Sequence, residues 1–394
     1  MLDPVFPPPP LLTKLVQPLA DALSLTTLPL HAHEVLIAFT LYHLINTRLS
    51  PAVSTWLFPD IYPHFNRKTK INWDVHVVSL CQSVLICALA LWVLYVDEER
   101  SAMGWRERVW GYTGAGGMIQ GLAAGYFLWD LMVSIANVNA FGWGMLAHAL
   151  CALIVFSFGF VSPISLYIIF RVPIAHDETQ RPFVNYYGPT FILYELSSPF
   201  LNFHWFFDKV NMTGSRAQLY NGLVLLASFF LCRLVWGTYQ SLRVYQDVWA
   251  ALQDPGPTFP TSGNTTLTQP AATQRALDSD DEVMRFAGTQ VVPVWLAVTY
   301  LASNTVLNTL NFYWFGKMIE AVRKRFRGTE TKRMASKKES TSVPSSKKAH
   351  EQKEEEGEAN GDIDVIPAKM APELDGSGIR TMMVEETAVR KRTR

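Results

Sequence analysis

Apolar runs of about 20 residues recur along this chain and constrain its fold more than any other feature. A helix of that length crosses a hydrocarbon core of about 30 Å. Of the 394 residues, 49% are hydrophobic and only 17% are charged, and the charges gather towards the ends of the chain. The sequence therefore predicts an all-α, polytopic membrane protein.

The order of apolar and polar stretches predicts four parts of the chain. Residues 1–29 form an N-terminal tail with an interfacial segment, and residues 30–66 hold the first transmembrane helix and its loop. Residues 67–327 form a bundle of six helices with a polar loop at 246–284, whereas 328–394 is a charged cytosolic tail without apolar periodicity, predicted to be disordered. About seven crossings are expected, near residues 30–49, 73–96, 118–138, 141–160, 186–205, 219–244 and 291–315.

Basic residues near the ends of the spans predict the orientation in the membrane. Arg67 opens a basic cluster after the first span, and Arg323 opens another after the seventh. These clusters place the N-terminus in the lumen and the C-terminus in the cytosol, which makes Asn264, in an Asn-Thr-Thr sequence, a lumenal glycosylation acceptor. Residues 163–172 are apolar but too short for a full span, so a half-crossing is expected; a full crossing would invert everything downstream.

The span at 186–205 carries an unusual number of polar side chains. Glu195, Ser198 and Asn202 follow one another at i, i+3 and i+7, so they share one face of a helix, with Trp205 about a turn further along. An ionisable group in hydrocarbon costs at least about 2.5–3.5 kcal/mol. This face is therefore predicted to turn towards the interior of the bundle.

Other spans offer matching polar faces. One interior that is polar or wet, surrounded by these helices, explains all of them. The residues predicted to line this lipid cavity, beyond those of the 186–205 span, are Tyr126 and Asp130 in the third span, His148 in the fourth, Arg233 in the sixth, and Asn304 and Asn308 in the seventh.

Two interpretations of this interior remain open. Asp130, Glu195 and Arg233 form a neutralised network that shapes a lipid-binding cavity without turnover, or the cavity is catalytic. In the second case His148 is the general base, and Asp130 or Glu195 orients it.

Several classes of function are not indicated. A net charge of zero offers no basic surface for nucleic acid, and no dinucleotide, Walker or His-Glu-x-x-His motif occurs. His31, His33 and Glu34 form a cluster at the start of the first span, where hydration at the membrane surface is favoured over a metal site. No metal and no cofactor are predicted.

Three motifs and one histidine resemble the TLC domain, which is shared by ceramide synthases, translocating-chain-associated proteins and smaller TLC-domain-containing proteins. They are Gly-Tyr-Phe-Leu-Trp-Asp-Leu at 125–131, the pattern Glu-x-Ser-x-Pro-Phe-x-Asn-x-x-Trp at 195–205, Asn-Phe-Tyr-Trp-Phe at 311–315, and His148 in its own span. The resemblance covers about residues 67–327. The pattern at 195–205 is its most specific part.

The resemblance points to the TLC-domain-containing subgroup. Ceramide synthases carry two adjacent histidines on the corresponding helix and a downstream pair of aspartates, whereas His148 lies between Ala147 and Ala149. The subgroup implies an endoplasmic reticulum membrane protein of lipid homeostasis, with a membrane lipid or fatty-acyl chain as its partner. An N-acyltransferase of the sphingolipid and ceramide type, with acyl-CoA as co-substrate of His148, is the alternative. A second alternative is a receptor that binds cargo or protein partners through its C-terminal tail.

Overall fold

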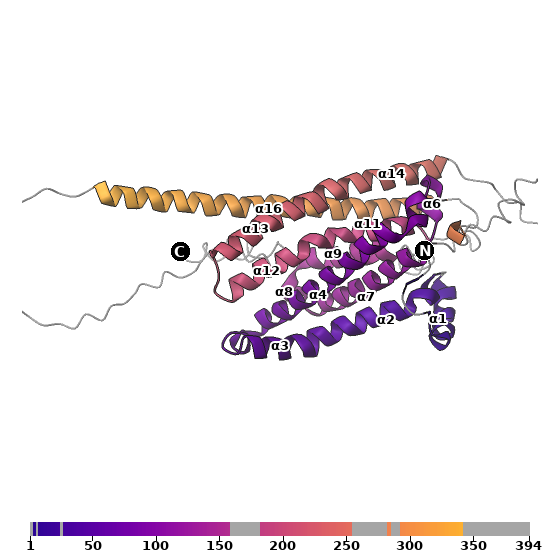
Figure 1. Ribbon diagram of the computed structural model, residues 1–394, viewed down its shortest axis with the longest axis horizontal. Helices are drawn as coiled ribbons and strands as arrows, with labels where there is room; N and C mark the ends of the chain where they lie inside the picture. Colours follow the sequence, from indigo (N-terminus) through magenta and orange to yellow (C-terminus); the bar gives the residue numbers. More distant parts are fainter. Residues whose placement is uncertain are drawn as a thin grey trace, which may run out of the picture.

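The computed structural model describes residues 3–4, 7–23, 27–157, 182–253, 282–284 and 292–341 of the protein. Every regular element within these ranges is a helix, and the long helices run side by side in an elongated bundle (Figure 1). The prediction of an all-α fold is confirmed.

The long helices follow one another in antiparallel order (Figure 1). They are α2 (Leu28–Leu44), which continues through the π-helical turn η1 (Ile45–Leu49) into α3 (Ser50–Leu57); α4 (Arg67–Val96); α7 (Gly114–Ala136); α9 (Trp143–Ser157); α12 (Ser198–Lys209); α13 (Arg216–Phe229), which continues through the π-helical turn η5 (Phe230–Trp236) into α14 (Gly237–Gln253); and α16 (Val294–Thr341). Shorter elements connect them: α1 (Pro10–Leu23), η2 (Tyr62–His64), α5 (Glu98–Ala102), α6 (Trp105–Trp110), α8 (Val138–Phe141), η3 (Asn185–Tyr187), α11 (Gly188–Phe191), η4 (Ile192–Ser197) and η6 (Glu282–Met284).

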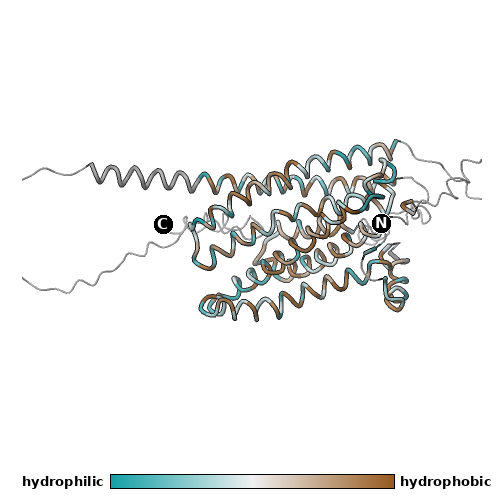
Figure 2. Tube along the Cα trace, in the orientation of Figure 1, coloured by the Kyte–Doolittle hydropathy of each residue, from teal (hydrophilic) through white to brown (hydrophobic). Residues whose placement is uncertain are grey.

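The outer surface of the bundle is apolar, as a lipid environment requires. Leu36 and Ile37 on α2 and Val84 on α4 are about half exposed, and apolar residues follow the helices along their length (Figure 2). Four helical stretches of the described residues are long and apolar enough to cross a membrane: Leu28–Leu57, Arg67–Val96, Trp105–Ala136 and Arg216–Gln253. The protein is therefore a polytopic membrane protein, and the exact number of crossings stays a prediction.

Glycines on α7 allow α2 to pack against it at close range. A Cβ atom added at Gly117 would meet the ring of His31, and one at Gly121 would meet Glu34. Small residues spaced by four along a membrane helix permit this kind of approach. Because α7 and α1 cover the start of α2, His31, His33 and Glu34 are buried. The prediction that they are hydrated at the membrane surface was wrong.

The predicted helix at 186–205 is not continuous. The chain forms η3, α11 and the 3₁₀ turn η4 before α12 begins at Ser198. Pro199 has no amide hydrogen to bond the carbonyl of Glu195 as an α-helix requires, which favours the tighter 3₁₀ turn before it.

Two predicted boundaries lie elsewhere in the structure. The polar loop was placed from residue 246, but α14 continues to Gln253 because Asp247 is buried and paired. The tail was placed from residue 328, but α16 continues to Thr341. Residues 163–172 and Asn264 lie outside the described residues, so their predicted roles stay predictions.

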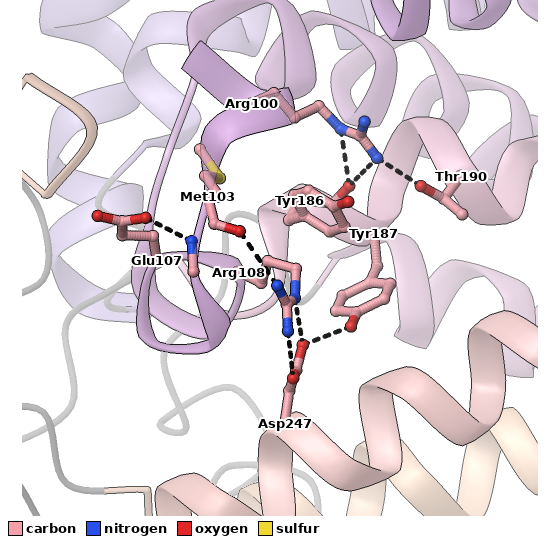
Figure 3. A network of polar contacts seen from close by, with 9 residues as sticks. Arg100, Met103, Glu107, Arg108, Tyr186, Tyr187, Thr190 and Asp247 are labelled. Carbon is pink, nitrogen blue, oxygen red and sulfur yellow. Dashed lines mark hydrogen bonds and ion pairs between the residues drawn. The ribbon is translucent and has the colours of Figure 1, made fainter. Parts of the chain in front are cut away.

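A polar network, the clasp of Arg108, Tyr187 and Asp247, joins α6, η3 and α14 at one end of the bundle (Figure 3). Arg108 Nε and Nη2 each donate to a carboxylate oxygen of Asp247 at 2.7 Å, and the hydroxyl of Tyr187 donates to the same carboxylate at 2.5 Å. The bidentate pair of Arg108 and Asp247 fixes the geometry of this end of the bundle and also stabilises it.

Nearby, burial lowers the pKa of Arg100, whose guanidinium donates to the carbonyl of Tyr186 at 2.9 Å.

We predict that Asp247→Ala destabilises the bundle by about 3 kcal/mol, because it leaves the guanidinium of Arg108 without its carboxylate. Thermal unfolding of the purified protein in mild detergent measures the effect. Asp60→Ala is the control, since Asp60 is exposed, and it should change stability by less than about 0.5 kcal/mol. An unchanged melting temperature in Asp247→Ala would show that the clasp is not structural.

Candidate functional site

A cavity of about 110 Å³ lies among α4, α7, α9, α12, η5 and α16. A water molecule needs about 10–15 Å³ on this scale, so the cavity accommodates several waters or a small polar group. The structure brings together seven of the predicted residues in its lining: Tyr126, Asp130, His148, Glu195, Ser198, Asn202 and Arg233.

Arg233 forms the charged centre of this cavity. It is 7% exposed and lies on the π-helical turn η5, a kind of turn that occurs often at functional sites. Its guanidinium Nη2 lies 3.5 Å from Oε1 of Glu195, and Nε donates to Ser197 Oγ at 3.0 Å. Nη1 donates to Asn311 Oδ1 at 3.2 Å and so reaches α16. A charge inside the bundle is tolerated because these acceptors surround it.

Glu195 is held from a second side as well. Ser198 Oγ donates to Glu195 Oε2 at 2.7 Å and accepts from Arg233 Nη2 at 3.1 Å. The predicted shared face of Glu195 and Ser198 is therefore real, although η4 and α12 supply its two members rather than one helix. Arg233, Glu195 and Ser198 therefore form a compact network at one wall of the cavity.

His148 and Asp130 lie on other walls, supplied by α9 and α7. The ring of His148 meets Trp314 edge-on, with 5.4 Å between the ring centroids. Within the described residues, Nδ1 of His148 has no hydrogen-bond partner. The orienting contact predicted from Asp130 or Glu195 is thus not made to this nitrogen.

His76 is a cavity residue that the sequence analysis did not include. Its Nδ1 lies 2.7 Å from Oδ1 of Asn202, whose Nδ2 donates to Ser79 Oγ at 3.1 Å. Since the amide oxygen accepts, Nδ1 donates and the lone pair of a neutral ring is on Nε2. His76 also stacks on Trp205 at 4.3 Å between the ring centroids. His76, Ser79 and Ser83 share one polar face of the second predicted span, which was the signal for it in the sequence, although His76 was not among the residues predicted to line the cavity.

Three predicted residues do not line the cavity. Trp205 packs in an aromatic cluster against Trp73 of α4. Asn308 accepts from Tyr194 at 3.1 Å and donates to Ser241 and Asn304 at 2.7 and 3.0 Å. Asn304 and Asn308 therefore join α16 to η4 and α14. Along α16 they come before the lining residue Trp314, Asn304 by about 15 Å and Asn308 by about 9 Å at about 1.5 Å per residue.

A family model of the TLC domain matches residues 72–176 and 178–320. The chain belongs to the TLC domain family. A TLC domain-containing protein of Schizosaccharomyces pombe is 33% identical over 317 residues, which cover 80% of this chain and 87% of that protein. Topoisomerase I damage affected protein 4 of Saccharomyces cerevisiae is 24% identical over 310 residues, covering 77% and 88%. Human TLC domain-containing protein 4 is 29% identical over 186 residues, covering 46% and 62%.

These relatives are consistent with the TLC-domain-containing subgroup, as the motifs indicated. Proteins of the family are generally membrane proteins linked to lipid biology. The cavity is formed by the region that the family model matches, since its lining extends from Asn72 to Met318.

We predict that Glu195→Leu destabilises the bundle by about 3 kcal/mol, because Arg233 then keeps a buried charge without its carboxylate. The double variant Glu195→Leu, Arg233→Met should recover most of that loss, since no charge remains unpaired. Thermal unfolding in detergent measures both. Glu320→Gln is the control: its contact with Lys317 is far more exposed, and its loss should cost less than about 0.5 kcal/mol. A double variant less stable than Glu195→Leu would contradict the assignment.

Proposed function

We propose that this protein binds a membrane lipid or fatty-acyl chain in the cavity around Arg233 and acts in lipid homeostasis. The observation that carries the proposal is the convergence of a guanidinium, two carboxylates and two imidazoles on one cavity between apolar helices. Intramembrane ionisable groups are costly, so their accumulation at one place indicates a function.

The lining suits an amphipathic ligand. Its polar residues lie beside apolar ones, and the latter would pack along an acyl chain. The apolar members are Val75, Phe127, Phe141, Met145, Leu201, Phe229, Trp314 and Met318. Asp130 and Glu195 outnumber the one guanidinium, which favours a head group that donates hydrogen bonds over an anionic phosphate. Lipids with a hydroxyl, amine or amide head group, including sphingoid bases and ceramides, have this chemistry.

An acyl-CoA-dependent N-acyltransferase is the second candidate. It is favoured by the unpartnered Nδ1 of His148, which leaves a nitrogen free to take a proton from an attacking amine while the thiolate of coenzyme A departs. His76 contributes a second imidazole to the cavity, but its Nδ1 is engaged by Asn202.

We also propose that the protein resides in the endoplasmic reticulum. Its N-terminus would lie in the lumen, and its C-terminal tail would lie in the cytosol and recruit protein partners.

Lipid mass spectrometry on the protein purified in mild detergent tests the binding function. We expect one class of unmodified lipid to co-purify with the wild type and with His148→Ala, and to fall at least tenfold in Glu195→Gln, because the amide pairs poorly with Arg233. His43→Ala is a matched control on α2, where His43 is exposed, and should retain the lipid.

Two outcomes would contradict the binding function. An N-acylated product in the wild type that changes to unreacted amine and acyl-CoA in His148→Ala would establish the enzyme instead. Equal lipid profiles in all four proteins would show that the cavity selects no ligand.

A further inference from the structure

A second group of buried polar residues lies at the start of α2, away from the cavity. His31, His33 and Glu34 are 0%, 5% and 1% exposed, although they lie near the start of a membrane-spanning stretch, Leu28–Leu57. Asp3, from the segment before α1, joins them. One ligand atom each from Asp3, His33 and Glu34 lies within 4.8 Å of the others.

The hydrogen bonds in this group leave specific atoms unused. Glu34 Oε2 lies 2.6 Å from His31 Nδ1, and His31 Nε2 lies 2.5 Å from the hydroxyl of Tyr112. In contrast, Glu34 Oε1 and both ring nitrogens of His33 have no hydrogen-bond partner within the described part of the chain. Buried polar atoms are nearly always satisfied, so an unpartnered imidazole beside two carboxylates requires an explanation.

A proton shared between carboxylates explains only part of this arrangement. It would account for the proximity of Asp3 and Glu34, since two carboxylates repel one another unless one of them is neutral. It gives no partner to either nitrogen of His33. A cation bound by all three side chains engages one nitrogen of His33 and an oxygen of each carboxylate together.

We propose that Asp3, His33 and Glu34 bind a divalent metal ion, with zinc as the ion that fits these ligands. Zinc takes imidazole nitrogen and carboxylate oxygen at about 2.0–2.2 Å, which places tetrahedral ligand atoms about 3.4 Å apart. Small side-chain rotations would bring the three atoms to that separation. With three protein ligands, the fourth position goes to water.

The surrounding residues support the ligands as metal sites generally require. His31 holds one oxygen of Glu34 and is itself held by Tyr112, so the other oxygen is directed by a chain of hydrogen bonds. Gly117 and Gly121 on α7 leave the room that His31 and Glu34 occupy. The metal would fasten the segment before α1 onto α2, at a place separate from the cavity.

Metal analysis of the intact chain tests this proposal, with a purification tag that contains no histidine. After exposure to zinc and gel filtration, inductively coupled plasma mass spectrometry should find about one zinc per chain in the wild type. His33→Ala should hold at least tenfold less. His43→Ala, a histidine further along α2, should bind as the wild type does.

Thermal unfolding with and without a chelator gives the second readout. The chelator should lower the melting temperature of the wild type and leave that of His33→Ala unchanged. Should His33→Ala fail to fold, Asp3→Asn serves in its place, because it alters only the segment before α1; its zinc affinity should fall about tenfold or more. A wild type without zinc, or full zinc binding in His33→Ala or Asp3→Asn, would overturn the proposal.

Discussion

A guanidinium within an apolar bundle has to be surrounded by acceptors, and the arrangement of this protein depends on how Arg233 meets that requirement. Glu195, Ser197 and Ser198 approach it from η4 and α12, and Asn311 approaches it from α16. Since Arg233 lies on η5, one side chain links three separate parts of the chain. The cavity is the space that these helices leave beside it.

The remaining polar contacts form at other levels of the bundle and serve to hold it. Asn202 joins α12 to α4 through His76 and Ser79, and Asn308 joins α16 to η4 and α14. The clasp of Arg108, Tyr187 and Asp247 closes one end. Within the described part of the chain, the group around Arg233 combines opposite charges, an unpartnered imidazole and open volume, so this part of the interior fits a lipid.

The sequence predicted the membrane fold and most of the polar residues of the cavity lining, because a charged residue in an apolar run has to face the interior. Asp130, Glu195 and Arg233 could be placed by this argument alone. It gives the face of a helix but not the position along the helix axis, so Asn304 and Asn308 were assigned to the cavity although they lie about two to three turns before Trp314, which lines it. Burial was missed at Asp247 and at Glu34, because it depends on packing: Arg108 of α6 is brought to Asp247, and α7 and α1 cover the start of α2 where Glu34 lies.

We propose that a lipid places its head group beside Arg233 and its acyl chain along the apolar lining residues, and photo-crosslinking tests this placement. Cells that express the full chain would receive a fatty acid with a photoreactive group in its chain, and the labelled peptides would be mapped by mass spectrometry. We expect label on cavity residues such as Met145, Leu201 and Phe229. Label confined to outer residues such as Leu36, Val84 and Leu91 would contradict it, because the lipid would then only surround the bundle.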